Sequence, residues 1–279
     1  MFRQTIERCV KHNTSLLSGA LAFYALLSLA PALYFVVAAA GMVIGRREAR
    51  GEVIEWATQM IGPGGSAFIG GVLDRDGMGS SFANIAGVAS LVVGVSGAFG
   101  ALQDALNLIW EVPPVERGYI KQFFFKRLMS FVAVTIAGLL LLIALLIGAM
   151  ISAAGKFMPQ ALPATEFLLQ AANFAVSLAL VTVLFAMLYR ILPDSWVAWR
   201  DVWTGAAVTA LLFSIGKTLI GLYLGHSTSS SPFGTAGSVV VFLLWVYYSA
   251  QIFLFGAEFT EVYAVARRAG SATPPRPAS

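Results

Sequence analysis

Cysteine and histidine are almost missing from this chain. Among 279 residues, Cys9 is the single cysteine, and His12 and His226 are the two histidines. One cysteine cannot close an internal disulfide or build a cysteine metal site, and two histidines so far apart in sequence do not make a ligand cluster. We therefore expect no metal site. No cofactor and no catalytic residues are predicted either.

Charge is also scarce, and this decides the class of protein. Charged residues make up 11% of the chain, hydrophobic residues 58%, and the mean hydropathy is +0.79. Soluble domains carry about 25% charged residues, so a soluble protein of this composition would need a larger core than 279 residues can enclose. The composition predicts an all-α, polytopic membrane protein whose immediate partners are lipids.

The basic isoelectric point does not point to nucleic acid. The pI is near 9.3, but membrane proteins acquire the same bias from lysines and arginines that hold their cytoplasmic loops. A GxxxxGK[ST] phosphate-binding run is missing as well, so transport driven by a nucleotide bound to this chain is excluded. We expect no nucleic-acid partner.

Apolar runs predict six membrane-spanning helices. A helix needs ~20 apolar residues to cross ~30 Å of hydrocarbon. The predicted helices, all within one membrane domain over residues 1–268, cover about 16–45, 82–103, 128–154, 166–192, 202–224 and 237–263. The segment 269–279 is predicted to be a disordered tail.

The connection over residues 46–81 is the longest polar one. It suggests a short helix over 52–61 that ends at the Gly62-Pro63-Gly64-Gly65 run, because glycine and proline break helices. The weakly apolar stretch after this run is too short to span, so it lies at the interface or folds back into the bundle.

The positive charges indicate the orientation. With a cytoplasmic N-terminus, the inner segments hold twelve of the eighteen lysines and arginines, the outer segments hold five, and Lys217 lies within a helix. Cytoplasmic loops of membrane proteins carry the excess of Lys and Arg. Both termini are therefore predicted to be cytoplasmic.

The helix over 82–103 carries a stripe of small residues. The stripe consists of Ala86, Ser90, Gly94 and Ala98, at a spacing of four residues. Such stripes let helix backbones approach closely in lipid, where no hydrophobic force drives helices together. We predict that this helix packs in the centre of the bundle and that the apolar helix over 128–154 faces lipid.

The last helix carries an unexpected line of polar side chains. Four of them, Tyr247, Gln251, Glu258 and Glu261, fall on one side of the helix, although a charge in hydrocarbon costs about 2.5–3.5 kcal/mol. They form either a packing face with satisfied hydrogen bonds or the wall of a substrate or ion path. Lys217 is a further path candidate, and it snorkels outward or faces an external cavity.

Glu258 is predicted to lie at the inner membrane edge. Arg127 and Arg190 end their segments at the same level, so they are its predicted ion-pair partners. Asp104, where the second helix leaves the membrane, is a further candidate for ion pairing at this face.

Several segments together resemble one known family. They are ALAFYALLSLAP, ALNLIW, RLMSF, YRILPDS, GAAVTALLFSIGKTLIGLYL and FGTAGSVVVFLLWVYYSAQIFLFGAEFTEVYA. The set resembles the YihY/virulence factor BrkB family of bacterial inner-membrane proteins, over roughly residues 6–268. The resemblance implies a six-helix, multi-pass protein of the inner (plasma) membrane. Phe233 departs from the pattern, where a tyrosine is expected.

The family has also carried the name ribonuclease BN, which the residues do not support. Phosphodiester cleavage needs a metal or an acid/base pair in a basic groove, whereas the inner carboxylates here are scattered at loop ends. We favour a transporter, exporter or lipid flippase for an envelope-related lipid or small molecule. The alternative is a scaffold or partner subunit without a substrate. A homo-oligomer is left open.

Overall fold

The computed structural model describes residues 1–73, 94, 97–113, 163–195, 197–227 and 234–271. In these residues the ordered secondary structure is helical and contains no strand, which confirms the all-α prediction for this part of the chain. The predicted helix over 128–154 and most of that over 82–103 lie outside the described residues.

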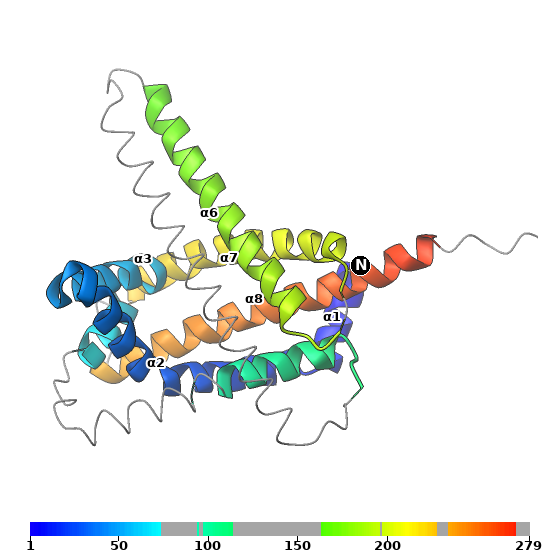
Figure 1. Ribbon diagram of the computed structural model, residues 1–279, viewed down its shortest axis with the longest axis horizontal. Helices are drawn as coiled ribbons and strands as arrows, with labels where there is room; N and C mark the ends of the chain where they lie inside the picture. The colour runs from blue at the N-terminus through cyan, green and yellow to red at the C-terminus, as the bar shows by residue number, and fades with distance from the viewer. Residues whose placement is uncertain (74–93, 95–96, 114–162, 196, 228–233, 272–279) are drawn as a thin grey trace, which may run out of the picture. The chain divides into compact units, whose positions relative to one another are not determined.

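Six helices of the described residues carry labels in Figure 1. Their bounds are α1 Phe2–Lys11, α2 Thr14–Ile44, α3 Arg46–Leu73, α6 Pro163–Ile191, α7 Trp199–Ser227 and α8 Gly234–Ser271. Residues 97–109 form a further helical stretch.

Three of these helices contain segments long and apolar enough to cross a membrane. The segments are Phe174–Ile191 in α6, Trp199–Leu219 in α7 and Val239–Arg268 in α8. Each lies mainly within a run that the sequence marked as spanning. The chain thus has the helices of a membrane protein in its described part.

The chain divides into two compact units, and the division falls within α7 and α8. The first unit contains residues 1–12, 106–212 and 255–279, and the second contains 13–105 and 213–254. The described parts of each unit are treated separately below.

In the second unit, α2 and α3 form a helical hairpin joined by Gly45 alone. Gly45 has φ of +93°, a conformation that glycine adopts at low cost. A Cβ at this position would collide with the carboxylate of Glu48. Side chains of both helices pack around a core of Ala57, Ile69 and Phe242.

The structure corrects the prediction for residues 46–73. The glycine–proline run at 62–65 does not end a short helix, because α3 continues through it to Leu73. Proline removes one backbone donor from a helix and favours a kink rather than an obligatory end. Ala57 and Ile69, on either side of the run, are both buried, so packing against the rest of the unit supports the helix.

The small-residue stripe is described only at Gly94 and Ala98. An added Cβ on Gly94 would lie 2.8 Å from Cβ and 2.9 Å from Cα of Ser28 in α2. Gly97 is similarly crowded by the ring of Tyr24. The backbones therefore approach as closely as the sequence predicts, while Ala86 and Ser90 lie outside the described residues.

The first unit contains two elements that the sequence did not indicate. Residues 2–11, which precede the first predicted helix, form the helix α1, and Thr5 in this helix and His12 just after it are buried. The last helix does not end at residue 263 but continues to Ser271, so the predicted disordered tail is wrong for residues 269–271. The remaining tail residues lie outside the described part.

Candidate functional site

A fully buried carboxylate marks the candidate site in the first unit. Glu258 of α8 lies within a candidate membrane span and has no exposed surface. Its Oε2 accepts a hydrogen bond from Nε of Arg8 at 3.1 Å, and its Oε1 lies 2.5 Å from Nδ1 of His12. A buried charge is tolerated only when it is paired and hydrogen-bonded, and both oxygens of Glu258 meet this condition.

Arg8 connects the carboxylate to a third segment. Its Nη2 donates to the backbone carbonyl of Ile109 at 3.1 Å, at the end of the helical stretch 97–109. A cation at this position satisfies one of the carbonyls that a helix end leaves unpaired. Arg8 thereby ties α1, α8 and the 97–109 stretch together with one side chain.

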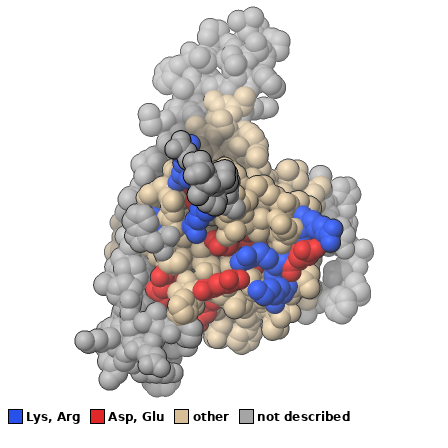
Figure 2. Space-filling view, turned by 90° about the vertical axis from the view of Figure 1, so that its right-hand side faces the viewer, with Lys and Arg blue, Asp and Glu red and all other residues tan. Residues whose placement is uncertain are grey.

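Two further ion pairs lie on the solvent side of this connection. Oε1 of Glu111 lies 3.5 Å from both Nη2 of Arg8 and Nζ of Lys11. Figure 2 shows the face on which basic and acidic side chains alternate. Because Glu111 and Lys11 are largely exposed, water screens this part of the network, whereas the bond between Arg8 and Glu258 is protected.

Glu111 holds a backbone conformation that normally belongs to glycine. Its φ is +50°, and it stands just after the end of the 97–109 stretch. The amides of Glu111 and Val112 bond to the carbonyls of Leu108 and Asn107, respectively, which is the Schellman arrangement of a helix end. The turn places the Glu111 carboxylate beside Arg8 and Lys11.

Two of the sequence segments that carry the family resemblance meet directly. Nδ2 of Asn107, from ALNLIW, donates to Oδ2 of Asp194, from YRILPDS, at 3.0 Å. The backbone amide of Asp194 donates in turn to Oδ1 of Asn107 at 2.8 Å. The reciprocal pair fixes the turn after α6 against the end of the 97–109 stretch.

Helices α7 and α8 cross at two reciprocal glycine–threonine contacts. A Cβ on Gly205 of α7 would collide with the side chain of Thr260 of α8, and a Cβ on Gly256 of α8 would collide with Thr209 of α7. Each threonine hydroxyl donates to the carbonyl of the glycine four residues earlier in its own helix. The two backbones therefore approach one another closely, as small residues allow.

This crossing lies two residues from the buried carboxylate and carries a further polar contact. The hydroxyls of Tyr189 in α6 and Thr209 in α7 are 3.0 Å apart, and Tyr189 is fully buried. Farther along α8, Arg267 forms an ion pair with Asp201 in the first turn of α7. Close contacts thus hold α6, α7 and α8 together on either side of Glu258.

The predicted polar stripe of the last helix is divided between the two units. In the second unit, Nε2 of Gln251 donates to the hydroxyl of Tyr247 and to Oγ of Ser15, both at 2.9 Å. Glu258 belongs to the first unit. Lys217, in the second unit, is partly buried in α7. The structure therefore gives Gln251 the satisfied hydrogen bonds of a packing residue.

Glu258 has other partners than the sequence suggested. The guanidinium of Arg190 lies over the ring of Trp199, 5.9 Å from its centroid, and Arg127 lies outside the described residues. Asp104 is exposed. The partners of Glu258 are Arg8 and His12, which precede the first predicted helix and were not among the predicted site residues. The spacing of four residues puts these two side chains on one side of a helix, but it does not indicate Glu258 as their partner.

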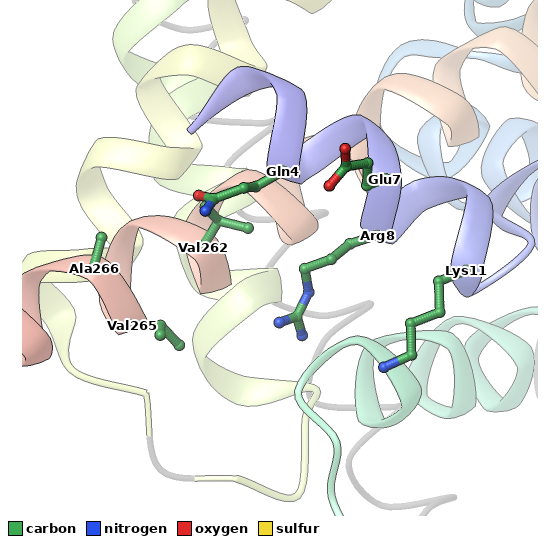
Figure 3. A pocket seen from close by; sticks show the side chains of 7 residues that line it. All are labelled: Gln4, Glu7, Arg8, Lys11, Val262, Val265 and Ala266. Carbon is green, nitrogen blue, oxygen red and sulfur yellow. The ribbon is translucent and has the colours of Figure 1, made fainter.

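A groove adjoins the network between α1 and α8 (Figure 3). It encloses about 390 Å³. Four polar side chains of α1 line one wall and three apolar side chains of α8 line the other: Gln4, Glu7, Arg8, Lys11, Val262, Val265 and Ala266. Within the described residues, no group of three or more His, Cys, Asp or Glu side chains gathers as metal ligands.

Comparison with known proteins finds related membrane proteins. A UPF0761 membrane protein of Ralstonia nicotianae is 30% identical over 66% of this chain and 40% of its own length. Those of Nitrosospira multiformis and Pseudoalteromonas translucida are each 25% identical, over 90% and 92% of this chain. The matched regions cover 58% and 83% of those two proteins.

The chain therefore spans about half the length of the first two of these relatives. No solved structure matches the chain. The family described as virulence factor BrkB matches residues 5–279. This match includes α1 from Thr5 onward, the Asn107–Asp194 pair and Glu258, and the chain belongs to the virulence factor BrkB family.

Proposed function

We propose that the chain is a multi-pass protein of the bacterial inner membrane with six spanning helices and both termini in the cytoplasm. Three candidate spans in the described residues support the proposal. The bias of lysine and arginine toward one set of connecting segments supports the orientation.

Cysteine labelling tests this topology in a Cys9→Ser background. An impermeant maleimide added to intact cells should label a cysteine at Ser229, in the predicted outer connection, and spare one at Ser271. Ser271 is the last residue of α8. The reverse pattern would overturn the orientation, and labelling of both positions would overturn the even number of spans.

The function that the site supports best is movement of an envelope-related amphiphile, as a transporter, exporter or lipid flippase without catalytic chemistry. The observation that carries this proposal is the buried Glu258, because an ionisable residue inside a membrane span is expensive and is retained for a role. Arg8 and His12 belong to the chain segment around α1, which lies outside the candidate spans.

In this proposal the contacts of Glu258 form a latch at the inner end of the path. The latch consists of Glu258, Arg8 and His12. Opening would separate α1 from α8, and Arg8 would keep its bonds to the Ile109 carbonyl and to Glu111. A charge-assisted bond to a side chain that retains other partners is a suitable contact to break and remake.

Transport of fluorescent phospholipid analogues in proteoliposomes tests the proposal. The protein should accelerate the loss of inner-leaflet fluorescence after an outside quencher is added, and Glu258→Gln should abolish this activity with the fold kept. Glu55→Gln is the matched control, because Glu55 is exposed on α3 in the second unit and does not line the groove. Equal rates for all three proteins and for empty liposomes would reject transport of this class.

A scaffold without a substrate is the second proposal. It is favoured by the complete pairing of Glu258 and by the hydrogen bonds of Gln251, since both are also expected of residues that only hold helices together. A scaffold gives no flux with any lipid. Its Glu258→Gln variant loses stability but has no transport activity to lose.

A further inference from the structure

The outward side of α1 presents an apolar stripe. Phe2, Ile6 and Val10 follow one another at a spacing of four residues and are 65%, 46% and 72% exposed. Residues at this spacing share one face of a helix. The buried face of α1 carries Thr5, and the chain after it carries His12, so the stripe is separate from the contacts that hold the site.

The groove side of the same helix is polar. Gln4, Glu7, Arg8 and Lys11 line the groove beside α8. Helix α1 therefore separates a polar side from an apolar one. With ten residues, it is too short to span a membrane. A short helix with a strong division between apolar and charged faces is typical of helices that lie in a membrane interface.

Two independent contacts indicate the depth at which α1 lies. The ring of Phe2 packs edge-on against Phe255, with centroids 5.7 Å apart, and Phe255 belongs to the candidate span of α8. The other contact is the ion pair of Arg267 with Asp201. This ion pair holds the end of α8 beside the first turn of α7. The α8 residues just before Arg267 line the groove between α1 and α8, so α1 lies next to this end of α8.

The first turn of α7 has the features of a headgroup level. Trp199 and Trp203 are 47% and 45% exposed, and their ring centroids are 6.5 Å apart. Tryptophans concentrate where the hydrocarbon of a membrane meets water. The end of α8, and with it α1, therefore lies near that boundary.

From these contacts we infer that α1 is an interfacial helix, and that the Phe2–Ile6–Val10 stripe docks on the lipid of the surrounding bilayer. Its partner is the boundary between headgroups and acyl chains, to which such helices insert their apolar face by about 5–10 Å. Arg3 and Lys11 are exposed cations of the same helix. In this orientation they lie at the level of the lipid phosphates. This inference does not depend on whether the protein moves a substrate.

Site-specific fluorescence tests the inference with two variants in the Cys9→Ser background. An environment-sensitive fluorophore is attached to Val10→Cys on the stripe or to Glu7→Cys on the groove side. Both proteins are placed in phosphatidylcholine vesicles, with or without phosphatidylglycerol and with nitroxide quenchers on the upper acyl chain. The label at 10 should be blue-shifted and lose more fluorescence than the label at 7. Phosphatidylglycerol should increase the difference.

Three results would overturn the inference. Equal quenching at both positions, or none at position 10, would exclude docking on lipid. Disulfide cross-linking between copies through Val10→Cys, unchanged when the protein is diluted with lipid, would assign the stripe to a second copy of the chain. If Val10→Cys does not fold, Ile6→Cys presents the same face one turn earlier and gives the same distinction.

Discussion

Arg8 and Glu258 are separated by 250 residues, yet the guanidinium Nε lies 3.1 Å from the carboxylate. The contact joins a helix outside the candidate spans to the longest of the three spans found in the described residues. Because the carboxylate is completely buried and the guanidinium mostly so, the pair is protected from the screening that weakens surface ion pairs.

Removing the carboxylate should therefore lower stability strongly. Glu258→Ala leaves Arg8 and His12 without their buried partner, and the loss of one member of a buried pair costs about 3–5 kcal/mol. Glu258→Gln can still accept a hydrogen bond and should lose less, about 1–3 kcal/mol. Thermal unfolding in detergent measures both. Glu7→Ala, at an exposed pair on α1, is the control and should melt near the parent temperature. Similar melting of Glu258→Ala and Glu7→Ala would contradict a structural role.

The crossing of α7 and α8 predicts a second effect. Gly205→Ala places a methyl group against Thr260, and overpacking of this kind costs about 1–3 kcal/mol. The matched control is Gly51→Ala in α3, where an added Cβ meets nothing within 4 Å. It should gain up to about 1 kcal/mol from the higher helix propensity of alanine. Opposite shifts in melting temperature are expected, and a shift of the same sign in both would count against the close crossing.

The helical class and the approximate positions of the spans in α6, α7 and α8 could be predicted from the sequence, because both depend on local properties. Apolar runs and their lengths are visible in one dimension, as for the segments now seen in α6, α7 and α8. The polar stripe was also found at Tyr247, Gln251 and Glu258, since helical periodicity is local. Close approach at Gly94 followed from the spacing of small residues.

The partners of Glu258 could not be found in this way. Pairing with Arg8 and His12 depends on contacts over more than 240 residues, and a charge count treats such residues only as markers of orientation. The glycine–proline run in α3 was misleading for a related reason. Its local preference is to end a helix, but burial of Ala57 and Ile69 on either side supports the helix through tertiary packing. The stripe on α1 was missed because three apolar residues are hidden among charges.

The Gly94 contact provides a third prediction. Gly94→Leu adds a butyl group where even a methyl group would meet the backbone of Ser28 at 2.9 Å. Helices that pack through small residues have no room for such a side chain, so the protein should lose stability or fail to fold. Gly71→Leu is the control, because Gly71 in α3 is exposed and a Cβ there meets nothing within 4 Å. Comparable yield and melting temperature for the two leucine variants would be evidence against close packing at Gly94.

Glu111 allows backbone strain to be separated from ion pairing. Its left-handed conformation costs a residue with a Cβ about 1–2 kcal/mol relative to glycine, while its exposed bonds to Arg8 and Lys11 contribute at most about 1 kcal/mol. Glu111→Ala loses the ion pairs and keeps the strain, whereas Glu111→Gly loses the same ion pairs and relieves it. We therefore expect the glycine variant to be the more stable of the two by about 1–2 kcal/mol.

Chemical denaturation in mixed micelles compares the two Glu111 variants, with the parent as reference. Glu111→Gly should unfold at the parent's denaturant midpoint or slightly above it, since the relieved strain equals or exceeds the lost ion pairs. Glu111→Gln completes the set, because it keeps the strained backbone and a hydrogen-bonding side chain but removes the charge. If the alanine variant were as stable as the glycine variant, the turn after residue 109 would not hold Glu111 in its left-handed conformation. The ion pairs alone would then hold the carboxylate beside Arg8. In that case Glu111→Gln should lose as much stability as Glu111→Ala.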